Sequence, residues 1–235
     1  MLRQTFLGFL LCISLQVGLV QKAILSSTNV DVGKIGATKL TDVEERIHRA
    51  TVKVKVPGGH GTGTYFKYKG YTFVLTAAHV VDEHETALII SDHNTLYGDV
   101  VLCDKQNDLA VIKVEDLGIE ALRWKPAEKV PGVGTDVYFV SYPSSHDKLS
   151  IRGEVAGYWD NGSNFYFLVH GYGWPGSSGA GIFNSRGQIV GTLTAVEVGS
   201  LGGRYPYQAI EDIVWMKPIT LLDQRLLLAE LSRAR

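Results

Sequence analysis

Cysteine is scarce in this sequence: only Cys12 and Cys103 occur among 235 residues. Cys12 lies in an apolar leading segment, so the folded body keeps a single cysteine and cannot form an internal disulfide. Packing must therefore stabilise the fold. Cys103 stands in the strand-like segment GDVVLCD, where we expect a small buried apolar residue and not a reactive thiol.

An excess of charge of one sign is also missing, because 23 Lys and Arg residues offset 24 Asp and Glu residues. A chain with a formal net charge of −1 lacks the basic footprint that nonspecific nucleic-acid binding needs, which excludes nucleic acid as a partner. Hydrophobic residues make up 45% of the chain and charged residues 20%, which excludes a disordered protein or a coiled coil.

His, Cys and acidic residues do not occur at metal-ligand spacing in the sequence. We therefore expect no metal site and no cofactor. The histidines outside the motifs discussed below are interpreted as solvated loop or strand-end residues: His48, His60, His84, His93 and His146.

No apolar run reaches the length of a membrane-spanning helix. Residues 5–20 carry no charge and follow a basic arginine, but their 16 residues fall short of the roughly 20 that a span needs. We interpret residues 1–20 as a signal peptide, with a short membrane anchor through residues 5–20 as the alternative and a buried helix as a third reading. Either of the first two makes the protein secreted, periplasmic or membrane-anchored outside the cytoplasm. Residues 21–41, rich in Ser, Thr, Asp and Gly, are predicted to be a linker.

Glycine, in contrast, is plentiful, with 26 residues, and short apolar segments are separated by Gly, Asn, Asp or Pro. About a dozen such segments follow one another without amphipathic helices between them, which predicts an all-β sandwich or barrel. The segment TVKVKV alternates apolar and polar residues at the period of a half-buried strand. Helix is predicted only at residues 42–50 and over residues 210–235, the latter with a break near Pro218.

A glycine-rich turn, GWPGSSGAG at residues 173–181, precedes an apolar segment. Glycine at position 176 would let the backbone N–H groups of residues 176 and 178 point at one spot, as an oxyanion hole requires. Taken alone, such a turn is usually no more than a turn.

Two polar residues at the ends of apolar segments change that interpretation. His79 follows LTAA, and Asp108 directly precedes LAVI. A carboxylate at the mouth of a buried strand is costly unless it is hydrogen-bonded, and a histidine N–H is a natural partner. His79, Asp108 and Ser178 occur in that order, 29 and 70 residues apart. An acyl hydrolase of another fold would need the order Ser, Asp, His and a Gly-x-Ser-x-Gly motif.

Together, TAAHVV, NDLAVIKV and GSSGAGIFNSRGQIVG resemble the trypsin-like, chymotrypsin-fold serine peptidases, most closely the HtrA-like branch. The resemblance covers roughly residues 43–216 and makes YQAIEDI, residues 207–213, the closing strand before the terminal helix. It implies two six-stranded antiparallel β-barrels with the site between them. We assign residues 42–216 to this peptidase domain and residues 217–235 to a C-terminal helix. Because the sequence ends at Arg235, we expect no PDZ module after the domain.

The resemblance makes Ser178 the nucleophile, His79 the general base and then acid, and Asp108 the group that orients the imidazole. Ser178 fits the family's Gly-x-Ser-Gly pattern, and the competing Ser177 does not. The backbone amides of Gly176 and Ser178 become the oxyanion hole. The implied activity is that of a serine endopeptidase acting on protein or peptide substrates.

The turn departs from the family pattern at two positions. Ser177 stands where Asn or Asp usually precedes the nucleophile, and Ala180 replaces a glycine. Neither change touches a reacting atom, but the altered turn leaves an alternative open: a catalytically silent protease-fold protein that binds peptides or partner proteins in the cleft.

Around the primary specificity pocket, the resemblance places Tyr172, the segment Thr194-Ala195-Val196 and the closing strand near Tyr207-Gln208. His170 lies on the segment that leads to the wall of this pocket. Tyr172 offers a phenol where a pocket for Arg or Lys needs a carboxylate, so basic residues are disfavoured. Val196 would shorten the pocket, which favours small apolar residues before the scissile bond. A partly protonated His170 facing the pocket would instead favour Glu or Asp.

Overall fold

The computed structural model describes residues 39–199, 208–226 and 229. The chain divides into two units, Met1–Lys39 and Leu40–Arg235, and the second unit carries all the elements named below. The predicted signal peptide or anchor at residues 1–20 lies outside the described residues, as does the predicted linker up to residue 38. Within the described part of the chain, no helix is both long enough and apolar enough to cross a membrane.

Six antiparallel strands close into a first barrel in the order β1-β4-β5-β6-β3-β2, because β1 pairs with both β4 and β2. The alternation in TVKVKV explains the inward face, since Val52 and Val54 are fully buried while Lys53 and Lys55 are not. A two-residue strand, β7 (Leu122–Arg123), runs parallel to β2 at the edge. The barrel strands are β1 (Thr51–Val56), β2 (Gly59–Tyr68), β3 (Tyr71–Thr76), β4 (Thr86–Ile90), β5 (Thr95–Asp104) and β6 (Leu109–Lys113).

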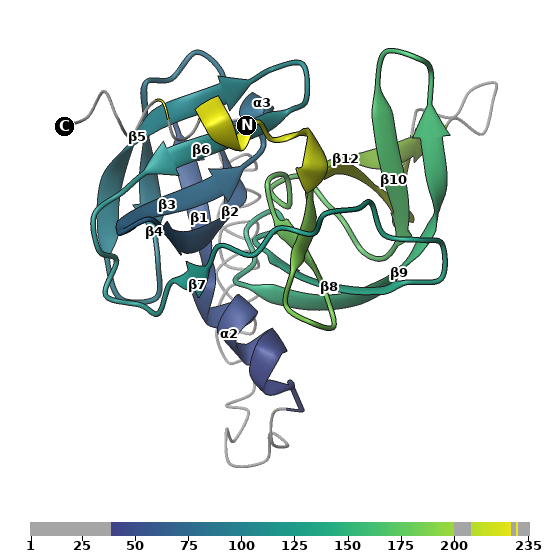
Figure 1. Cartoon of the computed structure of the whole chain (residues 1–235), viewed down its shortest axis with the longest axis horizontal. Coiled ribbons are helices and arrows are strands. Elements are labelled where there is room, and N and C mark those ends of the chain that lie inside the picture. Colours follow the sequence, from purple (N-terminus) through teal and green to yellow (C-terminus); the bar gives the residue numbers. More distant parts are fainter. Residues whose placement is uncertain (1–38, 200–207, 227–228, 230–235) are drawn as a thin grey trace, which may run out of the picture. The chain divides into compact units, whose positions relative to one another are not determined.

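A second barrel follows, closed in the order β10-β13-β12-β11-β8-β9. In Figure 1 the first barrel runs from purple to teal, and the second continues through green to yellow. The predicted fold of two six-stranded antiparallel β-barrels is confirmed. The strands of the second barrel are β8 (Asp136–Ser141), β9 (Leu149–Asp160), β10 (Phe165–His170), β11 (Gly181–Asn184), β12 (Ile189–Gly199) and β13 (Gln208–Pro218).

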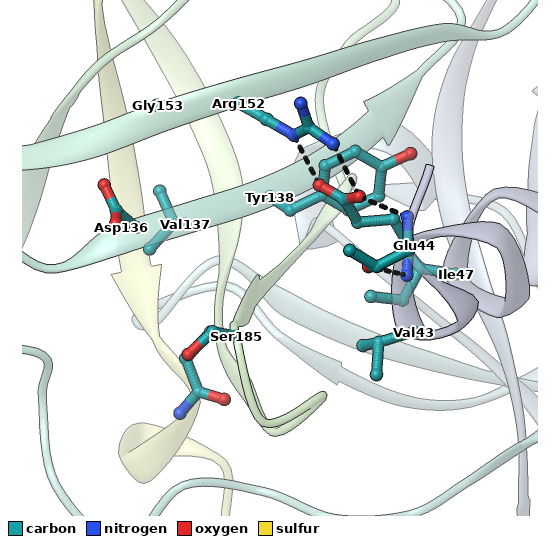
Figure 2. A pocket seen from close by; sticks show the side chains of 11 residues that line it. Val43, Glu44, Ile47, Asp136, Val137, Tyr138, Arg152, Gly153 and Ser185 are labelled. Carbon is teal, nitrogen blue, oxygen red and sulfur yellow. Dashed lines mark hydrogen bonds and ion pairs between the residues drawn. The ribbon is translucent and has the colours of Figure 1, made fainter. Parts of the chain in front are cut away.

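Helix α2 (Asp42–Ala50) forms where the sequence predicts it and begins at a capping box. Thr41 Oγ1 accepts from Glu44 N at 3.3 Å, and Glu44 Oε2 accepts from Thr41 N at 2.8 Å. Figure 2 shows the Glu44 carboxylate also bound to the Arg152 guanidinium on β9, in a pocket of about 380 Å³. Arg152 lowers the pKa of Glu44 from 4.5 to about 2, although burial opposes this shift.

One buried apolar cluster joins the two barrels to helix α2. Phe66 and Phe73 come from the first barrel, Tyr138 and Phe183 from the second, and Ile47 from α2. Burying one such side chain contributes about 1.5–3 kcal/mol, so this shared core stabilises the contact between the barrels.

The helix predicted at residues 210–218 is wrong, because this segment forms most of strand β13. Val214 and Met216 are buried, while the intervening Trp215 is only half-buried, which is the period of two of a strand. Pairing with β10 and β12 on both sides satisfies the backbone. A 3-10 turn, η2 (Ile219–Leu221), follows, and residues 224–226 and 229 are helical. The remainder of the helix predicted at 217–235 lies outside the described residues.

The expectation that Cys103 is buried is also wrong, since its side chain is exposed. A register shift between Val100 and Leu102 turns Leu102 toward the core, and its neighbour Cys103 therefore points outward. Partial burial, followed by the nearby carboxylates, raises the pKa of the Cys103 thiol, so the group is a poor nucleophile at neutral pH.

Candidate active site

His79 is carried by a one-turn helix, α3 (Ala78–Val81), just after strand β3. Asp108 lies in the turn before β6 with a φ of 51°, a left-handed conformation that Asp adopts more readily than most residues. Its carboxylate receives the His79 backbone N–H at 2.9 Å and His79 Nδ1 at 3.0 Å from each oxygen. The two residues are therefore held together by both backbone and ring contacts.

This pairing fixes the tautomer of His79. An ionised carboxylate can only accept hydrogen bonds, so Nδ1 carries the proton and Nε2 keeps a lone pair. The His79 side chain is 48% exposed, whereas that of Asp108 is 14% exposed. An oriented imidazole with an accessible basic nitrogen can take a proton from a neighbouring hydroxyl.

The turn at residues 174–179 packs against the segment that carries His79. Gly179 has a φ of 87°, and a Cβ added to it would lie 2.8 Å from the backbone nitrogen of Ala77. Only glycine fits such a close approach in this conformation. The turn with Ser178 and the segment with His79 are thus in direct contact through Gly179.

Hydrogen bonds fix four consecutive peptide units of this turn. The carbonyl groups are bound as follows: Pro175 O by Ser144 N at 2.7 Å, Gly176 O by Thr62 Oγ1 at 2.8 Å, Ser177 O by Ala180 N at 3.1 Å and Ser178 O by Thr62 N at 2.8 Å. The N–H groups of Ser177 and Gly179 donate to Trp174 O and Leu193 O. Within these four units, the N–H groups of Gly176 and Ser178 have no partner among the described residues. Gly176 has a φ of 100°. The two free N–H donors, one on Gly176 and one on Ser178, match the requirements of an oxyanion hole.

The two serines of the turn differ in their surroundings. Ser177 is fully buried, and its Oγ lies 3.1 Å from Ser141 Oγ and accepts from Trp174 N at 3.3 Å. Ser178 is half-buried, and its hydroxyl makes no hydrogen bond to His79 or to any other described residue. The Ser177 hydroxyl is therefore engaged in holding the turn, while the Ser178 hydroxyl is available.

Strand β12 carries three of the residues predicted around the specificity pocket. Val196 is half-buried, and its Cγ1 lies 2.9 Å from where a Cβ on Gly173 would stand. Ala195 is exposed, and the buried Oγ1 of Thr194 has no hydrogen-bond partner among the described residues. An unpaired buried hydroxyl costs about 1–3 kcal/mol. Contact of Thr194 with substrate stays a prediction.

Two further predicted pocket residues precede the turn, and Tyr207 lies outside the described residues. Tyr172 is half-buried, and His170 is exposed at the end of β10. Among the described residues, neither side chain makes a hydrogen bond or an ion pair. Their contact with substrate stays a prediction.

A buried lysine lies within electrostatic reach of Asp108. Lys217 on β13 is 1% exposed, and its Nζ lies 3.2 Å from Asn164 Oδ1 and 3.9 Å from the centre of the Tyr166 ring. Burial lowers the pKa of Lys217, while the carboxylates of Asp108 and Asp104 act in the opposite direction. Burial, and then the charge of Asp108, raises the pKa of Tyr166.

Three residues near the site stand in none of the sequence motifs: His60, Thr62 and Lys217. His60 was interpreted as solvated, yet its Nε2 lies 3.0 Å from Tyr142 O and 2.7 Å from where a Cβ on Gly176 would stand. A signal for Thr62 was present, because glycine on both sides within a strand marks a close approach of another part of the chain. Nothing in the sequence pointed to Lys217.

Among residues 39–199, 208–226 and 229, no three His, Cys, Asp or Glu side chains form a group that could hold a metal ion.

Two closed barrels, a histidine paired with an aspartate and a serine turn with free amides define a trypsin-like peptidase domain. The sequence model of the family described as "Trypsin-like peptidase domain" matches residues 61–191, which is more than half of the chain. This chain belongs to that family, and the resemblance drawn from the motifs is confirmed.

Relatives of known sequence and structure agree with this assignment. The chain is 31% identical over 147 residues to an Ectopseudomonas mendocina protein named "Probable periplasmic serine endoprotease DegP-like", in an alignment that covers 57% of this chain and 30% of that protein. The chain thus spans less than a third of the length of that relative.

The fold of this chain matches that of Rv3671c from M. tuberculosis in an inactive form, with a TM-score of 0.62 and 16% identity. The match covers 82% of this chain and 89% of that chain. The fold also matches the HtrA-type protease AlgW with a tripeptide, with a TM-score of 0.65, 17% identity, and 82% and 64% covered.

Proposed function

We propose that this chain is a serine endopeptidase that hydrolyses peptide bonds through an acyl-enzyme intermediate. Ser178 is the nucleophile, His79 the general base and then the general acid, and Asp108 the orienting group. The main observation behind the proposal is that both Asp108 carboxylate oxygens lie 3.0 Å from His79 Nδ1. The segment that carries His79 also contacts the 174–179 turn, which has two free N–H groups.

The reaction uses these groups in order. His79 Nε2 takes the proton of Ser178 as Oγ attacks the carbonyl carbon, and Asp108 stabilises the imidazolium that forms. The N–H groups of Gly176 and Ser178 donate hydrogen bonds to the negative oxygen of the tetrahedral intermediate. His79 then protonates the leaving amine, the C–N bond breaks, and the acyl group remains on Oγ as an ester. Water activated by the same nitrogen hydrolyses that ester and restores Ser178.

Protein or peptide substrates outside the cytoplasm fit this proposal. The relative from E. mendocina is named as a periplasmic serine endoprotease, which favours a periplasmic or secreted location for this chain too. Residues 5–20 would serve as an export signal or as a membrane tether.

Labelling with a fluorophosphonate probe tests the proposal, because the probe reacts with an activated serine. We expect labelling of the wild-type chain and of Ser177→Ala, and none of Ser178→Ala. Ser177→Ala is the matched control, since it removes the neighbouring hydroxyl of the same turn. Labelling that persists in Ser178→Ala and vanishes in Ser177→Ala would overturn the nucleophile assignment.

One observation favours a second candidate function, a catalytically silent protease-fold protein that binds peptides or partners in the cleft. Among the described residues, Ser178 Oγ makes no hydrogen bond to His79. Catalytic hydrogen bonds of this kind often tighten only when substrate binds, so the endopeptidase remains our conclusion. A folded wild-type chain that no fluorophosphonate labels would select the silent binder.

A further inference from the structure

We propose that Thr62 is a positioning residue that holds the oxyanion-binding turn from the opposite barrel. The inference rests on the proposed function, because it assigns a role in the same reaction. Thr62 belongs to β2 of the first barrel and is fully buried. The 174–179 turn that it holds lies between β10 and β11 of the second barrel.

Thr62 uses its backbone to bind both barrels. Its N–H donates to Ser178 O at 2.8 Å, which fixes the peptide unit that follows the nucleophile. Its carbonyl accepts from Thr76 Oγ1 at 2.7 Å, near the end of β3 and three residues before His79. The strand segment at Thr62 is thus tied both to the serine turn and to the segment that carries the histidine.

The Thr62 hydroxyl makes the contact on which the proposal depends. Oγ1 donates to Gly176 O at 2.8 Å and accepts from Tyr142 N at 3.0 Å. A hydroxyl has one proton, and because the Tyr142 N–H occupies a lone pair, that proton is left for Gly176 O. The direction of the hydrogen bond to the turn is therefore determined.

This bond fixes the peptide unit between the two free amides. The Gly176 carbonyl belongs to the unit that joins residue 176 to residue 177, and its trans partner, the Ser177 N–H, is held by Trp174 O at 2.8 Å. With both ends of that unit bound, the Gly176 and Ser178 N–H groups on either side have little freedom to rotate. Preorganised donors of this kind stabilise the oxyanion without reorganising during the reaction.

The same hydroxyl ties the turn to the loop that follows β8. Ser144, two residues after Tyr142, has a φ of 53° and donates its N–H to Pro175 O at 2.7 Å. The peptide unit that supplies the Gly176 N–H is therefore oriented by a loop whose own start is fixed on Thr62. Loss of the Thr62 hydroxyl would release both peptide units at once.

The test uses three purified full-length variants. Thr62→Val keeps the side-chain shape and removes the hydroxyl, and Thr62→Ser restores the hydroxyl. Thr64→Val is the matched control, because Thr64 lies two residues along the same strand, is equally buried, and has no hydrogen bond to its hydroxyl among the described residues. Thermal unfolding of each variant checks that it is folded at the assay temperature.

With a peptide substrate, we expect Thr62→Val to lower kcat by about 10²-fold with little change in KM, which is the scale of one lost oxyanion donor. Affinity for a peptide boronic acid, which forms a tetrahedral adduct on the serine, should fall in parallel. Thr62→Ser should recover most of both values, and Thr64→Val should match the wild type. Equal losses in Thr62→Val and Thr64→Val, or a loss in KM alone, would overturn the proposal.

A crystal structure of folded Thr62→Val separates this proposal from the proposed function. If the wild type proves inactive, a rotated peptide at residues 176–177 in the variant would still support the positioning role, and an unchanged turn would refute it. If Thr62→Val does not fold, Thr62→Ala compared with Thr64→Ala gives the same contrast. An active wild type with an unaffected Thr62→Val would refute the positioning role while leaving the endopeptidase in place.

Discussion

Glu44 on helix α2 and Arg152 on strand β9 form a two-point ion pair, with Nε 2.5 Å from Oε1 and Nη2 2.7 Å from Oε2. The carboxylate is buried, with 11% of its side chain exposed, whereas 61% of the arginine side chain is exposed. The pair joins the first helix of the peptidase domain to its second barrel (Figure 2).

The Glu44 pair should make stability depend on pH. The pKa of Glu44 is about 2 in the folded chain against 4.5 for an unperturbed group, so its contribution is complete above pH 4.5 and is lost as pH falls toward 2. Glu44→Gln keeps the capping hydrogen bond and should cost about 1 kcal/mol at pH 7, since solvent screens the exposed arginine. Denaturation measured from pH 2 to 7 should show the two proteins converging at the acidic end.

Glu45→Gln serves as the control, because Glu45 pairs with Arg49 on the exposed side of the same helix. It should cost less than about 0.5 kcal/mol at any pH. A constant stability difference between Glu44→Gln and the wild type down to pH 2 would contradict the assignment of the effect to the ion pair.

Removal of the candidate triad members should not be additive. Ser178→Ala and His79→Ala should each abolish nearly all peptidase activity while the fold persists, and the double variant should lose little more, because the residues act as a unit. Single-turnover kinetics on a chromogenic ester would measure this. Losses that multiply in the double variant would mean that the two side chains act independently.

Ser177→Ala should affect stability more than chemistry. Its Oγ is bound by Trp174 N and lies beside Ser141 Oγ in a fully buried site, so its removal leaves polar groups unsatisfied at a cost of about 1–3 kcal/mol. We expect a lower Tm with kcat within about tenfold of the wild type, the range of an indirect effect on one oxyanion donor. Complete inactivation of a folded Ser177→Ala would assign this serine a direct role.

Cleavage should occur mainly after small apolar residues, with shallow selectivity. Val196 packs against Gly173 and would limit the depth of the pocket, and one methylene is worth only about 1–3 kcal/mol in such a site. Val196→Gly should extend cleavage to larger apolar residues by up to about 10-fold, whereas Val133→Ala, a change at an exposed loop valine, should not. Sequencing of a digested peptide library measures both.

The same library decides between the two pocket hypotheses. Dominant cleavage after Arg or Lys would refute the argument from Tyr172. Cleavage after Glu that disappears in His170→Ala would establish the acidic alternative instead.

Local patterns in the sequence predicted the elements that depend on short-range interactions. The alternation of TVKVKV gave β1 correctly, and the capped segment at residues 42–50 gave α2. In residues 210–218, Ile210, Ile213 and Val214 stand at helical spacing, and only pairing with β10 and β12 makes the segment a strand. The two residues of β7 were too few to leave any period in the sequence.

The residues of the candidate site also fall into two groups, those that stand in sequence motifs and those that only long-range contacts bring to the site. His79, Asp108 and Ser178 stand in motifs and could be named from the sequence. The contacts of Thr62 span 114 residues to Gly176 and 80 to Tyr142, and no local pattern encodes a hydrogen bond over such separations. Lys217 was hidden for the same reason, since its partner Asn164 lies 53 residues away.

Because the candidate site is divided between two barrels, its parts come together only late in folding. His79 and Asp108 belong to the half of the domain that leaves the ribosome first, and the serine turn comes from the half that follows. Because the turn takes two of its hydrogen bonds from Thr62 in the earlier half, its amides acquire their final orientation only when the halves have docked. A partly synthesised or partly unfolded chain would then hold a histidine without a nucleophile, or a nucleophile without its anion-binding amides. Under the proposed function, peptide cleavage would therefore begin only after the second barrel has docked on the first.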